Sequence, residues 1–157
     1  ECRIIYDEFF FLLILLIDDK NNHEYFSHKY NISNTLNDEL SLVAKNFINF
    51  KKNSNFFTKD LKKNIFYYGK KHLEDLNLIN FLDKKKLKQK DYLQISNNIK
   101  NANIPKFPFD GNYLKDKGVE EGRVIGKILS LLKDEWLNNN FIISEQQILK
   151  IIKNKKN

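Results

Sequence analysis

The chain has 157 residues, enough for one or two small helical domains with a buried core. Its formal charge of +7 favours a polyanionic partner such as nucleic acid, although the abundance of Lys, Asn and Ile also fits A+T-rich codons and a merely solvated basic surface. The single cysteine, Cys2, excludes an internal disulfide framework and has no nearby Cys or His partner for zinc, so we expect a reducing compartment, the cytoplasm.

Helical periodicity runs through the first half of the chain. Apolar residues recur at intervals of three and four, which predicts an all-α fold, a multi-helix array without a sheet. Residues 9–17 are predicted to form a buried helix, and their nine residues are about half of the roughly 20 that span a membrane, so we expect no membrane partner. A short helix is predicted over 23–30. The next begins at a Ser33 or Asn34 cap and has one apolar face, formed by Leu36, Leu40, Val43, Phe47 and Phe50.

Residues 58–100 are also predicted to be helical. Thr58 is expected to cap a helix that ends at Gly69, and a second helix continues to Leu82 as its antiparallel partner. Five lysines within residues 84–90 favour a solvated linker over a binding site. A further helix is predicted over 91–100.

A boundary is predicted at Pro105, which divides the chain into regions 1–104 and 105–157. Six of the seven Gly and Pro residues of the chain lie between positions 105 and 126. The two prolines predict an extended segment, followed by a short helix over 112–117 with a stop at Gly118. A long helix is predicted over about 121–139 and a last amphipathic helix after Ser144. The long helix has a predicted core stripe of Ile125, Ile128, Leu129, Leu132 and Trp136.

The glycines of the long helix suggest a site for an anion. Gly122 and Gly126 are predicted to lie in its first turns, where each costs roughly 1 kcal/mol relative to Ala, so we expect a second helix or a phosphate to approach closely. Unpaired N–H groups at a helix start favour an anion, and Arg123 with Lys127 would flank it. Helix packing remains the structural alternative. The candidate phosphate contacts are Lys106, Lys115, Lys117, Gly122, Arg123 and Lys127.

The titratable residues predict neither a catalytic site nor a metal site. Asp18 and Asp19 are neighbours whose side chains point about 100° apart on a helix. His23 and His28 are five positions apart and share no helical face, while His72 and Asp75 suit an ordinary surface pair better than an acid–base pair. No nucleotide-binding glycine motif or nucleophile motif is present.

The stretch "FPFDGNYLKDKGVEEGRVIGKILSLLKDEWLNNNF" resembles the C-terminal tail of bacterial CCA-adding tRNA nucleotidyltransferases. These belong to class II of the polymerase-β superfamily, together with bacterial poly(A) polymerases. Tyr113 stands where that family has Asp, and Glu121 and Arg123 replace its two prolines. Upstream segments resemble the family's body region more loosely. The matching positions are Pro108, Gly111, Leu114, Gly118, Gly122, Gly126 and Leu129, with Trp136 near the helix end.

The resemblance implies that the chain is the helical body, 1–104, and the tail, 105–157, of such an enzyme. It would hold the acceptor stem and T-arm of tRNA, while a head outside this sequence adds CCA from CTP and ATP with Mg²⁺. The chain contains no Met and begins Glu1-Cys2-Arg3, so we expect a fragment without catalytic residues or a cofactor of its own. The alternatives are a poly(A) polymerase C-terminal region and a non-enzymatic helical protein-interaction module.

Overall fold

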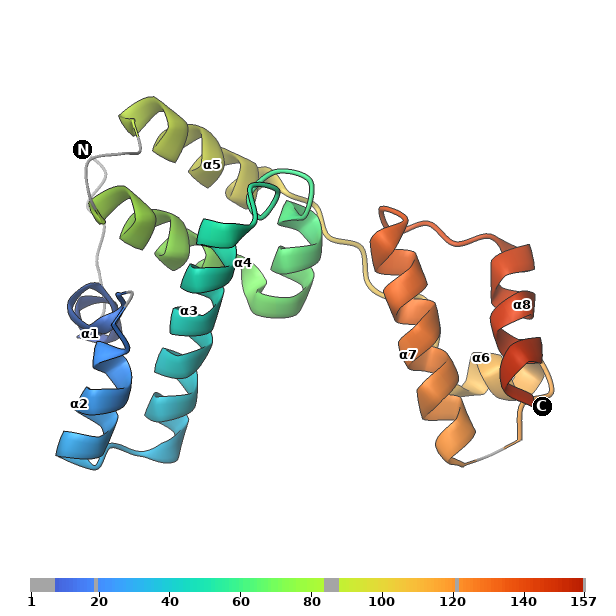
Figure 1. Cartoon of the computed structure of the whole chain (residues 1–157). Coiled ribbons are helices and arrows are strands. Elements are labelled where there is room, and N and C mark those ends of the chain that lie inside the picture. Colours follow the sequence, from blue (N-terminus) through green and yellow to red (C-terminus); the bar gives the residue numbers. More distant parts are fainter. Residues whose placement is uncertain (1–7, 19, 84–87, 121, 157) are drawn as a thin grey trace. The chain divides into compact units, whose positions relative to one another are not determined.

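The computed structural model describes residues 8–18, 20–83, 88–120 and 122–156, which form eight helices and no strand (Figure 1). The predicted all-α fold is therefore confirmed. The chain divides into two compact units, residues 1–103 and 104–157. Cys2, Asp19, Glu121 and the lysines of segment 84–87 lie outside the described residues.

The first unit contains five helices. Helix α4 packs against α5 and α3, and α3 packs against α2. The predicted apolar face of α3 is confirmed, since Leu40, Val43 and Phe47 are almost fully buried and Leu36 and Phe50 are half-buried. The bounds are α1 Glu8–Leu16, α2 Asn22–Tyr30, α3 Asn34–Lys52, α4 Leu61–Leu82 and α5 Gln89–Asn101.

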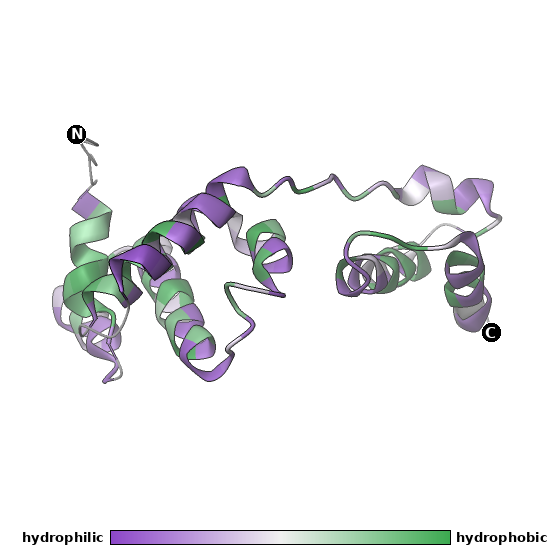
Figure 2. Cartoon of the chain, turned by 90° about the horizontal axis from the view of Figure 1, so that it is seen from above, coloured by the Kyte–Doolittle hydropathy of each residue, from purple (hydrophilic) through white to green (hydrophobic). Residues whose placement is uncertain are grey.

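Helix α1 is not the fully buried helix that its sequence predicts. Its side chains are apolar on every side, and Figure 2 colours almost the whole helix as hydrophobic. Phe10 and Leu13 are buried, but Phe11 is 57% and Leu15 is 74% exposed. Helices α2 and α4 supply its packing partners in this unit, and they cover one face only. No helix in the described ranges is both long and apolar enough to cross a membrane.

The predicted helix caps differ in outcome. Ser33 caps α3 as predicted, because its side-chain oxygen accepts a hydrogen bond from the backbone N–H of Leu36 at 3.3 Å. The prediction of a Thr58 cap is wrong. Asp60 is the residue that precedes α4, and Thr58 belongs to a turn in which its carbonyl accepts from the N–H of Leu61.

Gly69 interrupts α4 as predicted, with φ 82° and ψ 162° inside the helix. The two helical segments that Gly69 separates meet at a kink with no connecting loop (Figure 1), so the predicted division is confirmed and the expected antiparallel pairing is wrong. Two antiparallel helices require a connecting loop of about two to five residues. A single non-helical residue changes the direction of the helix without folding it back on itself.

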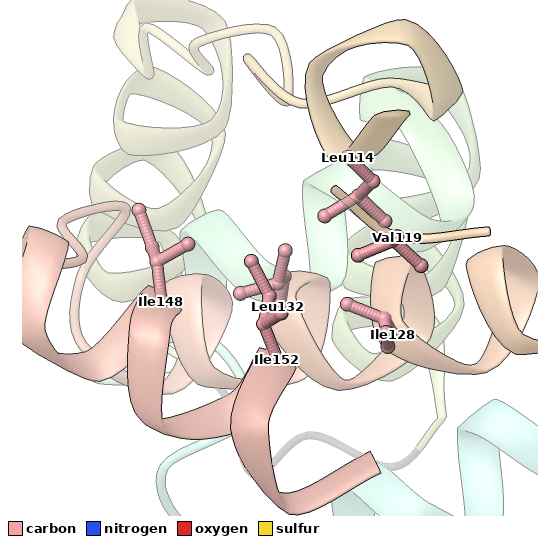
Figure 3. Packing of buried hydrophobic residues seen from close by; sticks show 6 residues of the cluster. All are labelled: Leu114, Val119, Ile128, Leu132, Ile148 and Ile152. Atoms are coloured by element: carbon pink, nitrogen blue, oxygen red, sulfur yellow. The ribbon is translucent and has the colours of Figure 1, made fainter. Parts of the chain in front are cut away.

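The second unit is built from α6 Gly111–Asp116, α7 Arg123–Asn138 and α8 Glu145–Lys156. The predicted stripe on α7 is confirmed, since Ile128, Leu132 and Trp136 are buried and Ile125 and Leu129 are half-buried. Figure 3 shows side chains of all three helices converging on one core. Its buried members are Leu114, Val119, Ile128, Leu132, Ile148 and Ile152.

Gly118 ends α6 as predicted, through a Schellman motif. Its N–H donates to the carbonyl of Lys115 at 2.8 Å, and the N–H of Val119 donates to the carbonyl of Leu114 at 3.0 Å. Gly118 has φ 74°, a conformation that an L side chain disfavours. Leu114 and Val119 flank this turn and both enter the core. The left-handed residue therefore directs the chain from α6 back into the interior.

Two local interactions define the connection between α7 and α8. The N–H of Phe141 donates to the carbonyl of Trp136 at 2.7 Å, and the two rings pack edge-to-face with centroids 4.8 Å apart. Ser144 and Gln147 then form a capping box, in which each side chain accepts a hydrogen bond from the backbone N–H of the other. The predicted start of the last helix after Ser144 is confirmed.

The two glycines Gly118 and Gly126 give opposite predictions for stability. Gly118→Ala should lower the free energy of unfolding by about 1–2 kcal/mol, because Ala disfavours a positive φ. Gly126→Ala should raise it by up to about 1 kcal/mol, because Gly126 lies within α7 and has open space where a Cβ would stand. Urea unfolding followed by circular dichroism measures both. Equal effects of the two substitutions would contradict this account.

Candidate nucleic-acid interface

All six predicted phosphate contacts lie in the second unit and are exposed. Lys106 lies in the segment between α5 and α6, and Lys115 lies on α6, which Lys117 follows. Gly122, Arg123 and Lys127 lie at the start of α7. An open hollow of about 380 Å³ is lined by two of the six, Lys115 and Gly122. The other lining residues are Asp110, Gly111, Asn112 and Ile125.

Gly122 was predicted to lie in the first turn of the long helix, but it is the residue that precedes α7. Its φ of 127° is a conformation that L side chains rarely adopt. The expected close approach of a second helix is wrong within the described part of the chain, since no protein atom lies within 4 Å of a Cβ built on Gly122 or on Gly126. Backbone conformation, rather than space, explains Gly122. Neither glycine marks an internal helix contact.

The residue that precedes α7 provides no side-chain cap. Ser33 of α3 and Asp110 of α6 accept hydrogen bonds from first-turn N–H groups, whereas the N-cap residue of α7, like those of α2, α4 and α5, does not. First-turn N–H groups carry partial positive charge and attract anions. Arg123 and Lys127 lie four residues apart on the exposed side of this helix, away from the buried Ile128 and Leu132.

The remaining lysines contribute unequally to this positive charge. Lys117 forms an ion pair with Glu145 of α8, with 3.2 Å between Nζ and Oε1. This pair offsets the charge of Lys117 and links the end of α6 to the start of α8. In sequence, residues 104–157 contain ten basic and seven acidic residues. The excess is small, so the placement of individual basic side chains decides where an anion would bind.

The carboxylates singled out in the sequence have structural partners. Asp18 accepts a hydrogen bond from the backbone N–H of Lys20 at 2.9 Å and another from the side chain of Asn22. The Asp75 carboxylate is buried and lies 2.8 Å from Nζ of Lys71. Within the described ranges, no three His, Cys, Asp or Glu side chains are grouped to hold a metal ion.

His72 belongs to a buried polar contact that the sequence reasoning missed. Its Nε2 lies 3.0 Å from Nδ2 of Asn46, which joins α4 to α3. Asn46 is almost fully buried, and its side-chain oxygen Oδ1 has no hydrogen-bond partner among the described residues. Burial lowers the pKa of His72 from 6.5 to about 4, because desolvation disfavours the charged imidazolium. An Asn between the apolar positions Val43 and Phe47 was the available signal.

Comparisons with known proteins identify no relative of this chain. No protein-family model matches it, and neither a curated protein nor a solved structure does. A functional assignment therefore depends on the resemblance of residues 107–141 and on the geometry described above.

The lowered pKa of His72 predicts a stability that depends on pH. Neutral His72 favours the folded state, so its contribution is fully present above pH 6.5 and is lost as the pH falls from 6.5 towards 4. Protonation of His72 lowers the free energy of unfolding by at most about 3 kcal/mol, and solvent around the partly exposed ring makes this loss smaller. Urea unfolding at pH 7.5 and pH 5 should show this loss in the unsubstituted chain.

A matched pair of variants assigns the effect. His72→Gln should reduce the difference between the two pH values, because Gln cannot be protonated. His28→Gln removes an exposed histidine and should leave most of the difference in place. An unchanged pH dependence in His72→Gln would contradict the assignment.

Proposed function

We propose that residues 104–157 bind the phosphate backbone of RNA through the N-terminal face of α7. One observation carries the proposal. Helix α7 begins after Gly122, which provides no side-chain cap, and Arg123 and Lys127 are exposed at this end of the helix. A phosphate there would accept hydrogen bonds from backbone N–H groups and lie close to two cationic side chains. The guanidinium of Arg123 suits it further, since it can contact two phosphate oxygens at once.

Transfer RNA is the RNA that the proposal names. Double-stranded RNA is recognised mainly through phosphates, 2′-hydroxyls and shape, because its deep major groove is closed to side chains. A rigid helical unit with a few placed cations suits that mode of recognition. The stretch of residues 107–141 supports this choice through its resemblance to the tail of CCA-adding tRNA nucleotidyltransferases.

The proposed role of the chain is to hold the acceptor stem and T-arm while another part of the enzyme adds CCA. CTP, ATP and Mg²⁺ would bind to that other part, the head. A poly(A) polymerase is the alternative within the same superfamily. The nucleotides incorporated by the enzyme that contains this chain distinguish the two.

A protein-interaction module is the second candidate function. The exposed apolar side chains of α1 favour it, since Phe11 and Leu15 lie largely in solvent. Exposed apolar surface of this kind commonly marks contact with another protein. Such a module would show no preference for tRNA over a duplex of matched length and charge.

Charge reversal on α7 tests the RNA-binding proposal. Arg123→Glu combined with Lys127→Glu should weaken tRNA binding by about tenfold or more at moderate salt. The double substitution should also lower the slope of log affinity against log salt by about 2, since each phosphate contact contributes about 0.9. Fluorescence anisotropy with labelled tRNA, measured at several salt concentrations, gives both quantities.

The matched control reverses the same charge on α8. Lys150→Glu with Lys153→Glu changes two exposed lysines of that helix by the same amount. This control should bind tRNA nearly as the unsubstituted chain does. Equal weakening by both double variants would show non-specific attraction, and no weakening by the α7 variant would refute the proposed site.

A further inference from the structure

Helix α2 carries an exposed aromatic and cationic surface in the first unit. Tyr25 is 67% and Tyr30 is 61% exposed. Nζ of Lys29 lies 5.6 Å from the centroid of the Tyr25 ring and 5.5 Å from that of Tyr30. These distances are within the range of cation–π interactions. Tyr25 and Tyr30 are five positions apart and lie on either side of Lys29, whose side chain joins them into one surface that we call the tyrosine–lysine face.

The surroundings leave this face available to a ligand. Lys29 has no ion pair with a carboxylate anywhere in the described ranges, and its Nζ lies near the two tyrosine rings. The centroids of the Phe26 and Tyr30 rings are 4.9 Å apart, so Phe26 packs against Tyr30 from within α2. A hollow of about 490 Å³ adjoins the face and is lined by Glu24, Tyr25, His28 and Lys29.

The chemistry of α2 favours nucleotides over an apolar peptide. Its exposed side chains are amide, carboxylate, imidazole, ammonium and phenol groups, and none is aliphatic. Aromatic rings beside a cation are the elements that bind unpaired nucleotides, since every base can stack on a ring and the cation attracts the phosphate. Glu24 is the acidic group at this surface and limits its positive charge.

We propose that the tyrosine–lysine face binds unpaired nucleotides of RNA. Bases stack on Tyr25 and Tyr30, and Lys29 contacts a phosphate between them. This surface lies in the first unit, and its binding does not depend on the phosphate site proposed for α7. The two proposals differ in ligand, because this face takes single strands and α7 takes the backbone of folded RNA.

A labelled oligouridine of about 12 nucleotides, which has little secondary structure, is the probe for the full chain. Tyr25→Ala combined with Tyr30→Ala should weaken its binding at least about fivefold, because stacking contributes about 1–3 kcal/mol per base. Tyr25→Phe with Tyr30→Phe keeps both rings and should bind within about twofold of the unsubstituted chain. Lys29→Gln should lower the salt slope by about 0.7. Lys45→Gln, at an exposed site on α3, is the control and should leave the salt slope unchanged.

Three results would overturn the inference. These are no binding of oligouridine by the unsubstituted chain, unchanged binding by the Ala variant, and equal weakening by the Ala and Phe variants. Circular dichroism of each variant establishes that it is folded, and Tyr25→Leu with Tyr30→Leu tests the same loss of rings with more apolar bulk. The α7 double variant separates the two proposals, since it should bind oligouridine normally while losing tRNA affinity.

Discussion

The left-handed backbone at Gly118 is the constraint on which the second unit depends. Helix α6 has six residues, too few to be stable in isolation, so it exists because Leu114 enters a shared core. The turn at Gly118 brings Val119 into that same core five residues later. A second positive φ, at Gly122, precedes α7. Two glycine conformations thus define how the chain passes from one helix to the next.

The same geometry determines what the unit presents to solvent. With Ile128 and Leu132 held in the core, the opposite side of α7 exposes Arg123 and Lys127. A capping side chain at position 122 would accept hydrogen bonds from first-turn N–H groups, and glycine has no side chain to do so. The residue required by the backbone is therefore also the residue that suits an anion. The proposed RNA site and the path of the chain have one physical origin.

Local signals in the sequence predicted most of the features that neighbouring residues determine, although the Thr58 cap was predicted wrongly. The Ser33 cap, the Gly118 stop and the α7 stripe each depend on a few adjacent positions. The burial of α1 and the path of α4 after Gly69 depend on distant packing, and their predictions were wrong. Gly122 shows why the site was only partly predictable. A glycine can be required by a positive φ or by the close approach of another group, and the neighbouring sequence does not distinguish the two. The tyrosine–lysine face was missed because exposure of a tyrosine on a short helix depends on the tertiary fold.

Hydrogen–deuterium exchange of the full chain, with and without tRNA, tests the central claim most directly. Backbone N–H groups in the first turn of a helix exchange readily, because they lack intrahelical partners. The account predicts that saturating tRNA slows exchange at the start of α7, around residues 122–127, and leaves α8 unchanged. Exchange at the start of α7 that is unaffected by bound tRNA would contradict it.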